Sequence, residues 1–124
     1  MDIKLEHMSN IDKRHGKRAK YDLKLYYPRV NNNSIYNKYN LGSPILETID
    51  ISETGISFIS RAELREDDFI SFLLTIENNP SFWCMAEVKW IQKIEGFFKV
   101  GCQFYCLNED QIRYIREYVS KVID

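Results

Sequence analysis

Residues 82–106 read Phe-Trp-Cys-Met-Ala-Glu-Val-Lys-Trp-Ile-Gln-Lys-Ile-Glu-Gly-Phe-Phe-Lys-Val-Gly-Cys-Gln-Phe-Tyr-Cys, and apolar side chains recur at every second position along much of this stretch. A period of two places alternate side chains on opposite faces of a β-strand. The pattern predicts strands over 82–93 and 96–106, which Glu95 and Gly96 join in a tight hairpin. We therefore expect antiparallel β-structure to dominate the fold.

The same period extends upstream of this hairpin. It predicts four further strands, over 21–27, 45–52, 55–60 and 69–77. The first of these is expected to bury one face, made by Tyr21, Leu23, Leu25 and Tyr27. The turn-rich segment 30–44 is expected to hold a short extra strand near Ile35 and Tyr36. Six main strands at this spacing favour a closed or nearly closed antiparallel barrel.

The end of the chain changes to a helical period. Asn108 suits a helix N-cap, and Gln111 stands at the capping-box position three residues later. Behind them follows an apolar stripe at helical spacing, made by Ile112, Ile115, Val119 and Val122. We expect this C-terminal α-helix to lie against the barrel or its open end, with a dimer contact as the alternative.

Composition and length predict one globular domain. The 124 residues are 44% hydrophobic and 28% charged, which excludes a disordered chain. No apolar run approaches the roughly 20 residues of a spanning helix, and the first residues lack the pattern of a secretory signal. We expect a cytoplasmic protein without membrane insertion, in which residues 1–12 form a flexible segment and residues 13–124 a single domain.

The charges are distributed unevenly along the chain. Residues 1–30 hold eight Lys or Arg and four Asp or Glu, a balance of +4, whereas residues 31–124 hold nine and fourteen, a balance of −5. The basic segment indicates an anionic partner, and a solvated basic tail explains it equally well. The acidic remainder makes a nucleic-acid polymer an unlikely partner, because no strand-length basic track is present.

Cysteine and histidine residues indicate neither a metal site nor catalysis. Cys84, Cys102 and Cys106 lack metal-ligand spacing and are expected to be buried thiols. His7 and His15 have no nearby Cys or carboxylate at metal spacing. Because no nucleophile, base and orienting group occur in a recognisable arrangement, we expect a protein that is not an enzyme and holds no cofactor.

Two short motifs carry the functional signal. Arg14 and Arg18 form an RxxxR pair, and the run Asp50-Ile-Ser-Glu-Thr-Gly55 forms DxSxxG. Their order and separation, followed by 87–91, 100–104 and a terminal helix, resemble the PilZ family of cyclic di-GMP receptors. The resemblance implies a mainly β fold, a six-stranded antiparallel PilZ-type β-barrel with a C-terminal α-helix.

The resemblance also implies roles for five residues. Arg14 and Arg18 would bind guanine and phosphate, Asp50 and Ser52 would contact guanine, and Gly55 would provide room. In a regular strand Asp50 and Ser52 share the outer side, opposite Ile49 and Ile51. Gly55 is expected to take a positive φ or to admit a ligand close to the backbone. The alternative is an ordinary hairpin turn with Asp and Ser in it.

Neighbouring residues refine this interpretation. Lys13 and Lys17 are secondary candidates for ligand binding. Gly16 disfavours a settled helix, so the arm, the segment that carries Arg14 and Arg18, is expected to become ordered around an anion. A permanently docked arm is the alternative. Lys13 stands where many relatives carry arginine, and lysine lacks the planar group that supports a second ligand molecule. The number of cyclic di-GMP molecules bound, one or two, therefore stays open, with one favoured. Trp90 is expected in the core, although its ring could border the site.

The sequence thus predicts a non-catalytic cyclic di-GMP receptor, a monomer or weak dimer, that signals through an unidentified downstream protein or through self-association. Two alternatives remain at this point. One is an adaptor with the same fold that binds only protein. The other is a small barrel that binds single-stranded nucleic acid through its basic arm and exposed tyrosines.

Overall fold

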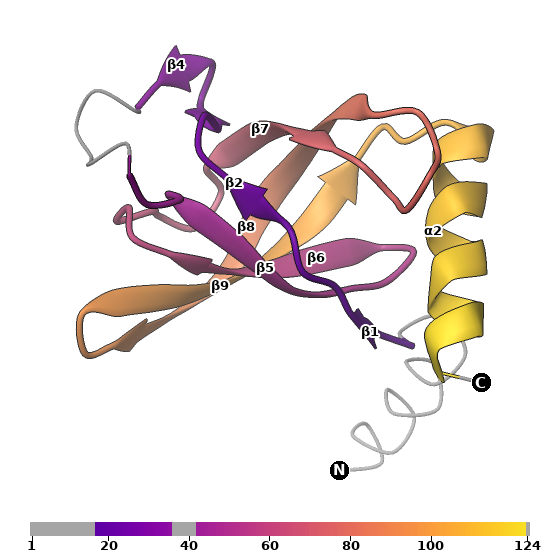
Figure 1. Ribbon diagram of the computed structural model, residues 1–124. Coiled ribbons are helices and arrows are strands. Elements are labelled where there is room, and N and C mark those ends of the chain that lie inside the picture. Colours follow the sequence, from indigo (N-terminus) through magenta and orange to yellow (C-terminus); the bar gives the residue numbers. More distant parts are fainter. Residues whose placement is uncertain (1–16, 36–41, 124) are drawn as a thin grey trace, which may run out of the picture.

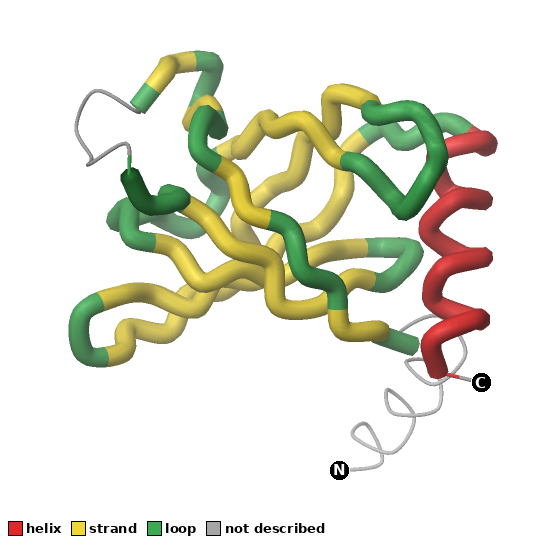
Figure 2. Tube along the Cα trace, in the orientation of Figure 1, coloured by secondary structure: helices red, strands yellow, loops and turns green. Residues whose placement is uncertain are grey.

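The computed structural model describes residues 17–35 and 42–123, which form one sheet and one helix (Figures 1 and 2). Lys13 and Arg14, with the whole of segment 1–12, lie outside these ranges. The elements are β1 (Ala19–Lys20), β2 (Lys24–Leu25), β3 (Arg29–Val30), β4 (Asn33–Ser34), β5 (Leu46–Ile51), β6 (Gly55–Ser60), β7 (Phe69–Leu74), β8 (Phe82–Ile94), β9 (Phe97–Tyr105) and α2 (Glu109–Ile123).

The strands form an antiparallel sheet in the order β1-β5-β6-β9-β8-β7-β3-β4, and β2 also pairs with β5. A mainly β fold with a C-terminal helix is thus confirmed. The prediction of a six-stranded barrel, closed or nearly closed, is wrong, because the described residues form a nine-stranded sheet that is not closed into a barrel.

The sheet stays open because the predicted first strand, 21–27, is broken. β1 and β2 pair with β5 at one edge, whereas β3 pairs with β7 near the other. Pro28 lies between β2 and β3 and has no backbone N–H to donate to a ladder. The chain therefore passes between the two edges as a short connection instead of a hydrogen-bonded strand.

This break also changes which side chains are buried. Leu25 is buried and Tyr21 and Leu23 pack against the core, but Tyr27 is 64% exposed, contrary to the prediction. In the connection that follows, the extra strand falls on Asn33–Ser34. It ends before Ile35, and Tyr36 lies outside the described ranges.

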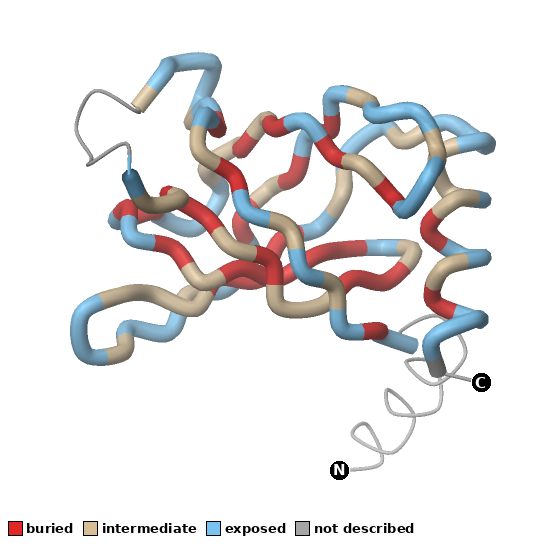
Figure 3. The backbone as a smooth tube through the Cα atoms, in the orientation of Figure 1, coloured by how far each residue is buried: buried red, intermediate tan, exposed pale blue. Residues whose placement is uncertain are grey.

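The remaining five strands lie where the sequence predicts them, with ends shifted by up to three residues. Between the last two strands, Glu95 and Gly96 make the expected hairpin, in which Gly96 has a φ of +87°. Buried residues occur along the strands from β5 to β9 (Figure 3). Among them, Phe58 and Phe72 pack edge to face, with ring centroids 5.3 Å apart.

Helix α2 begins with the predicted capping box. The Gln111 backbone N–H donates to Asn108 Oδ1 at 2.8 Å, and the Asn108 N–H donates to Gln111 Oε1 at 3.0 Å. The helix stands along one end of the sheet and contacts β1 (Figure 1). Ile115 and Val119 are buried there, whereas Val122 is 45% exposed.

Two of the three cysteines match the prediction of buried thiols. Cys84 and Cys102 are buried in the core, but Cys106 is exposed. β9 ends at Tyr105, and Cys106 has a φ of 57°. Cys106 thus lies just beyond the end of β9 and does not continue its alternation, which explains why the prediction for Cys106 is wrong.

Candidate functional site

Asp50 reaches the outer face of the sheet because β5 contains a β-bulge. The register of β5 against β6 shifts between Thr48 and Asp50. Thr48 is buried and Ile51 is fully buried, so strict alternation from Thr48 would have turned Asp50 inward. The extra residue, Ile49, reverses the alternation and leaves Asp50 half-buried. Ile49 itself is half-buried, so it does not share the core position of Ile51 as predicted.

A second bulge acts in the same way on β8. The register against β9 shifts between Val88 and Trp90, where Lys89 is the extra residue. Val88 is buried but Trp90 is 45% exposed, so the prediction that Trp90 belongs to the core is wrong. Trp90 instead lies flat over Gly101, since a Cβ at Gly101 would come within 2.1 Å of its indole.

Asp50 and Trp90, the two residues that the bulges turn outward, belong to one row of paired residues across the sheet. Asp50 pairs with Ser57, Ser57 with Gly101, and Gly101 with Trp90. The two central residues are small, so the row forms a low floor between a carboxylate and an indole. Such a floor leaves space for a ligand on the outer face.

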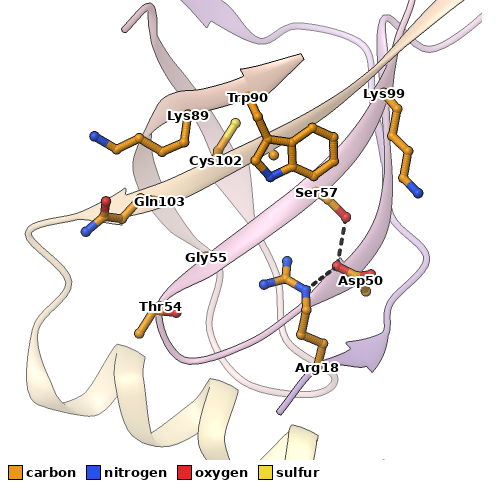
Figure 4. Close-up of a pocket in the computed structure, with 11 residues that line it drawn as sticks. Arg18, Asp50, Thr54, Gly55, Ser57, Lys89, Trp90, Lys99, Cys102 and Gln103 are labelled. Carbon is orange, nitrogen blue, oxygen red and sulfur yellow. Dashed lines mark hydrogen bonds and ion pairs between the residues drawn. The ribbon is translucent and has the colours of Figure 1, made fainter. Parts of the chain in front are cut away.

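A pocket of about 520 Å³ opens above this floor (Figure 4). Its lining includes three cationic side chains, Arg18, Lys89 and Lys99, and one carboxylate, Asp50. The formal sum of these charges is +2, although the whole chain carries −1. A concave surface with excess positive charge attracts anions.

Arg18 joins the two sequence motifs. Its Nε donates to Asp50 Oδ1 at 2.7 Å, and its Nη1 donates to Ser52 Oγ at 3.3 Å. Ser57 Oγ also donates to Asp50 Oδ1, at 2.7 Å. Within the part of the chain that the structure describes, Arg18 uses two of its five N–H donors in these bonds, which leaves others to contact a ligand. Because the side chains of Arg18 and Asp50 are 38% and 30% exposed, this ion pair fixes geometry more than it stabilises the fold.

Ser52 is fully buried and organises the turn that follows β5. Its Oγ accepts hydrogen bonds from the N–H groups of Thr54 and Gly55, each at 3.2 Å. The Ser52 N–H donates to the Gly55 carbonyl at 2.8 Å and closes the turn. This is the hairpin-turn role of the alternative reading. Contact between Ser52 and guanine stays a prediction.

Gly55 is required by its own neighbours in the sheet. Its φ is not positive, and a Cβ at this position would lie 2.3 Å from the Cys102 carbonyl oxygen on β9. The backbone that approaches Gly55 closely is therefore that of β9, whereas close approach of a ligand stays a prediction. Gly55 also lines the pocket, as the motif implied.

Other predicted ligand residues are placed differently. Arg14 and Lys13 lie outside the described residues, and Lys17 is exposed without lining the pocket. Lys89, Trp90 and Lys99 line the pocket, but the two motifs do not include them. The alternating polar positions of β8 and β9 offer the only sequence signal for the lysines, since such positions face outward.

Burial makes the cysteine at the pocket wall unreactive. It raises the pKa of the Cys102 thiol, and likewise that of Cys84, to about 12. Both thiols are thus protonated at neutral pH. Over residues 17–35 and 42–123, no group of three His, Cys, Asp or Glu side chains is placed to hold a metal ion. Within the same ranges no helix is long and apolar enough to span a membrane.

Comparison with known proteins relates the whole domain to one family. The PilZ domain family matches residues 12–121. Among solved structures, the chain is similar to the Bacillus subtilis inhibitor of motility MotI/DgrA, with a TM-score of 0.61 and 12% identity over 84% of this chain and 48% of that one. No curated protein sequence matches the chain.

Two structures of MrkH from K. pneumonia are also similar. A P2(1) crystal form gives a TM-score of 0.53 and 14% identity over 82% of this chain and 48% of that one. The apo state gives 0.52 and 16% over 83% and 50%. At these identities the likeness concerns the fold alone, and the chain spans about half the length of the structures it matches.

Proposed function

The chain belongs to the PilZ domain family, and from this premise we propose that it is a non-catalytic cytoplasmic receptor for cyclic di-GMP. PilZ domains are generally binding domains, and their characteristic motifs are present here as RxxxR and DxSxxG. The observation that carries the proposal is the contact between the two motifs. Arg18 of the first donates to Asp50 of the second at 2.7 Å, on the rim of a cationic pocket.

The chemistry of the pocket suits the ligand. Cyclic di-GMP carries two phosphodiester charges, and each guanine presents the acceptors N7 and O6 and donors at N1 and N2. The free N–H groups of Arg18 can grip either a phosphate or the N7/O6 edge. Among the described residues, the bonds from Arg18 and Ser57 both fall on Asp50 Oδ1, so Asp50 Oδ2 can accept from the donor edge. A volume near 520 Å³ lies within the range of small-molecule sites.

We extend the predicted set with three residues of the pocket wall. Trp90 rests one face of its indole on Gly101 and is 45% exposed, so the other face can stack on a guanine. Lys99 adds a positive charge for the phosphates, and Lys89 adds a second, which Glu87 offsets in part at 3.4 Å. Arg14, and Lys13 and Lys17 as secondary candidates, complete the proposed ligand set from the arm. Ligand binding in the pocket would then be signalled through contact with a partner protein or through self-association.

Calorimetric titration tests this proposal. Cyclic di-GMP, GTP, cyclic di-AMP and an oligonucleotide are each titrated into the wild type. We expect binding of cyclic di-GMP, weakened in Arg18→Ala and in Asp50→Ala by roughly 1 to 3 kcal/mol each, since each variant removes a directed guanine or phosphate contact. Arg65→Ala and Glu95→Ala are matched controls, because both residues are exposed and lie outside the pocket lining.

The outcomes separate the candidate functions. Preferential binding of the oligonucleotide would support the nucleic-acid alternative, and no binding of any nucleotide would support a protein-only adaptor. Cyclic di-GMP binding that neither Arg18→Ala nor Asp50→Ala weakens would show that the ligand occupies another surface.

A further inference from the structure

Helix α2 is fastened to the segment that carries Arg18. The Tyr118 hydroxyl donates to the Lys20 carbonyl oxygen at 2.5 Å, and the Tyr118 ring meets the Tyr21 ring edge-on with centroids 5.1 Å apart. Lys20 pairs with Asp50 across β1 and β5 and follows Arg18 by two residues. One helix residue therefore holds the strand from which Arg18 reaches the pocket.

The same helix is also fastened to the motif turn. Arg116 Nη2 donates to Glu53 Oε1 at 3.1 Å. Glu53 directly follows Ser52, whose hydroxyl oxygen accepts from Arg18. Arg116 and Tyr118 are two residues apart on α2, so one short stretch of helix touches both segments that the ligand must bridge.

β1 depends on such outside contacts because it is very short. It has two residues, which pair with β5 as Ala19 with Ile51 and Lys20 with Asp50, and the next backbone bond to β5, from the Tyr21 N–H to the Ile49 carbonyl, is 3.2 Å long. Segments with few ladder bonds and exposed neighbours open at low free-energy cost. α2 is anchored independently, since Ile115 is fully buried and Val119 nearly so. The helix can therefore hold β1 more firmly than β5 alone.

We propose that α2 is a positioning element of the nucleotide pocket, in which Tyr118 and Arg116 hold Arg18 and the 52–55 turn in the binding geometry. For its ligand this inference rests on the proposed function above. Coupling between two sites is reciprocal. The docked helix strengthens ligand binding, and the ligand in turn stabilises the docked helix.

The test uses Tyr118→Phe and Arg116→Gln, singly and together. Phenylalanine keeps the ring against Tyr21 and removes only the hydroxyl bond to Lys20. In the double variant we expect cyclic di-GMP affinity to fall by about fivefold or more, the lower end of measured couplings between sites. Arg113→Gln is the matched control, because the partners of Arg113 among the described residues, Asp110, Glu117 and the ring of Tyr114, all belong to α2 itself.

A ligand-free measurement separates this inference from the proposed function. NMR follows hydrogen exchange of Arg18 Nε–H, which is bonded to Asp50. Faster exchange in the double variant and unchanged exchange in Arg113→Gln support the role of α2, with thermal unfolding confirming that each variant is folded. Equal exchange in the wild type and the double variant, or an affinity within about twofold of wild type, overturns it. A wild type that binds no cyclic di-GMP would instead remove the proposed function, and Arg18 exchange would still decide the role of α2.

Discussion

At the scale of single residues, the site depends on two β-bulges that side-chain alternation does not encode. The resemblance of the two motifs to the PilZ family predicts that Arg18 and Asp50 serve one site, and the structure places their side chains 2.7 Å apart. Alternation from Val88 predicts Trp90 in the core, whereas the bulge at Lys89 turns it outward. This bulge arises in the pairing of β8 with β9, so the alternation within residues 82–93 does not by itself predict it.

Gly101 supports the indole of Trp90, and this leads to a prediction. In Gly101→Ala the new Cβ would lie 2.1 Å from the indole Nε1, so the ring must move off the floor of the pocket. We expect cyclic di-GMP affinity to fall about tenfold, since loss of one stacked base costs roughly 1 to 3 kcal/mol. Calorimetry measures the affinity, and thermal unfolding controls for the fold. An affinity equal to wild type would mean that Trp90 does not stack on the ligand.

At the scale of elements, local sequence signals are sufficient to predict a helix or a hairpin whose determinants lie within it. The capping box of Asn108 and Gln111 predicts the start of α2, and Gly96 predicts the last hairpin. The predicted first strand is wrong in its length, because its ladder with β5 covers Lys24–Leu25 and the chain pairs with β7 only from Arg29 onward. A period of two shows that a segment is extended, but it does not show which neighbour pairs with it.

The capping box gives a second prediction. Asn108→Ala removes the acceptor of the Gln111 N–H and should lower the free energy of unfolding by about 1 kcal/mol. Urea unfolding measures the change. Ser120→Ala, at an exposed position within the same helix, serves as the control and should leave stability nearly unchanged. A loss in Ser120→Ala as large as that in Asn108→Ala would contradict a specific role of the cap.

At the scale of the whole molecule, the sequence predicts a β-rich domain with a terminal helix but not the open sheet. Closure depends on whether the two edges, β5 with its short partners and β7 with β3, pair with each other. The connection through Pro28 prevents a continuous strand there. Burial along β7, by contrast, follows the predicted alternation, and its inner side chain Phe72 meets Phe58 of β6 in the core.

The buried thiols make the stability of the molecule sensitive to alkali. Burial raises the pKa of Cys84 and Cys102 from 9.0 to about 12, so the unfolded chain releases these protons at lower pH than the folded one. Their contribution to stability is complete below pH 9 and is lost as the pH rises from 9 to 12. Burial is the main cause that raises the pKa of Tyr21 from 10.0 to about 12. Tyr21 therefore adds to the same loss of stability above pH 10.

Urea unfolding at a series of pH values from 8 to 11 measures this dependence. A Cys84→Ala/Cys102→Ala variant should be less stable at every pH, because side-chain atoms are removed from the core. Its stability should nevertheless fall less steeply above pH 9 than that of the wild type. Equal slopes in the two proteins would show that the thiols do not govern the alkaline loss.

The most direct measurement of the central claim is the fluorescence of Trp90 in a Trp83→Phe variant. The chain has two tryptophans, and Trp83 is 60% exposed away from this pocket, so the variant leaves Trp90 as the only indole reporter. The account predicts that cyclic di-GMP changes this fluorescence in a saturable manner, and that Arg18→Ala weakens the change. Binding seen by calorimetry without any response from Trp90 would contradict the placement of the ligand between Asp50 and Trp90.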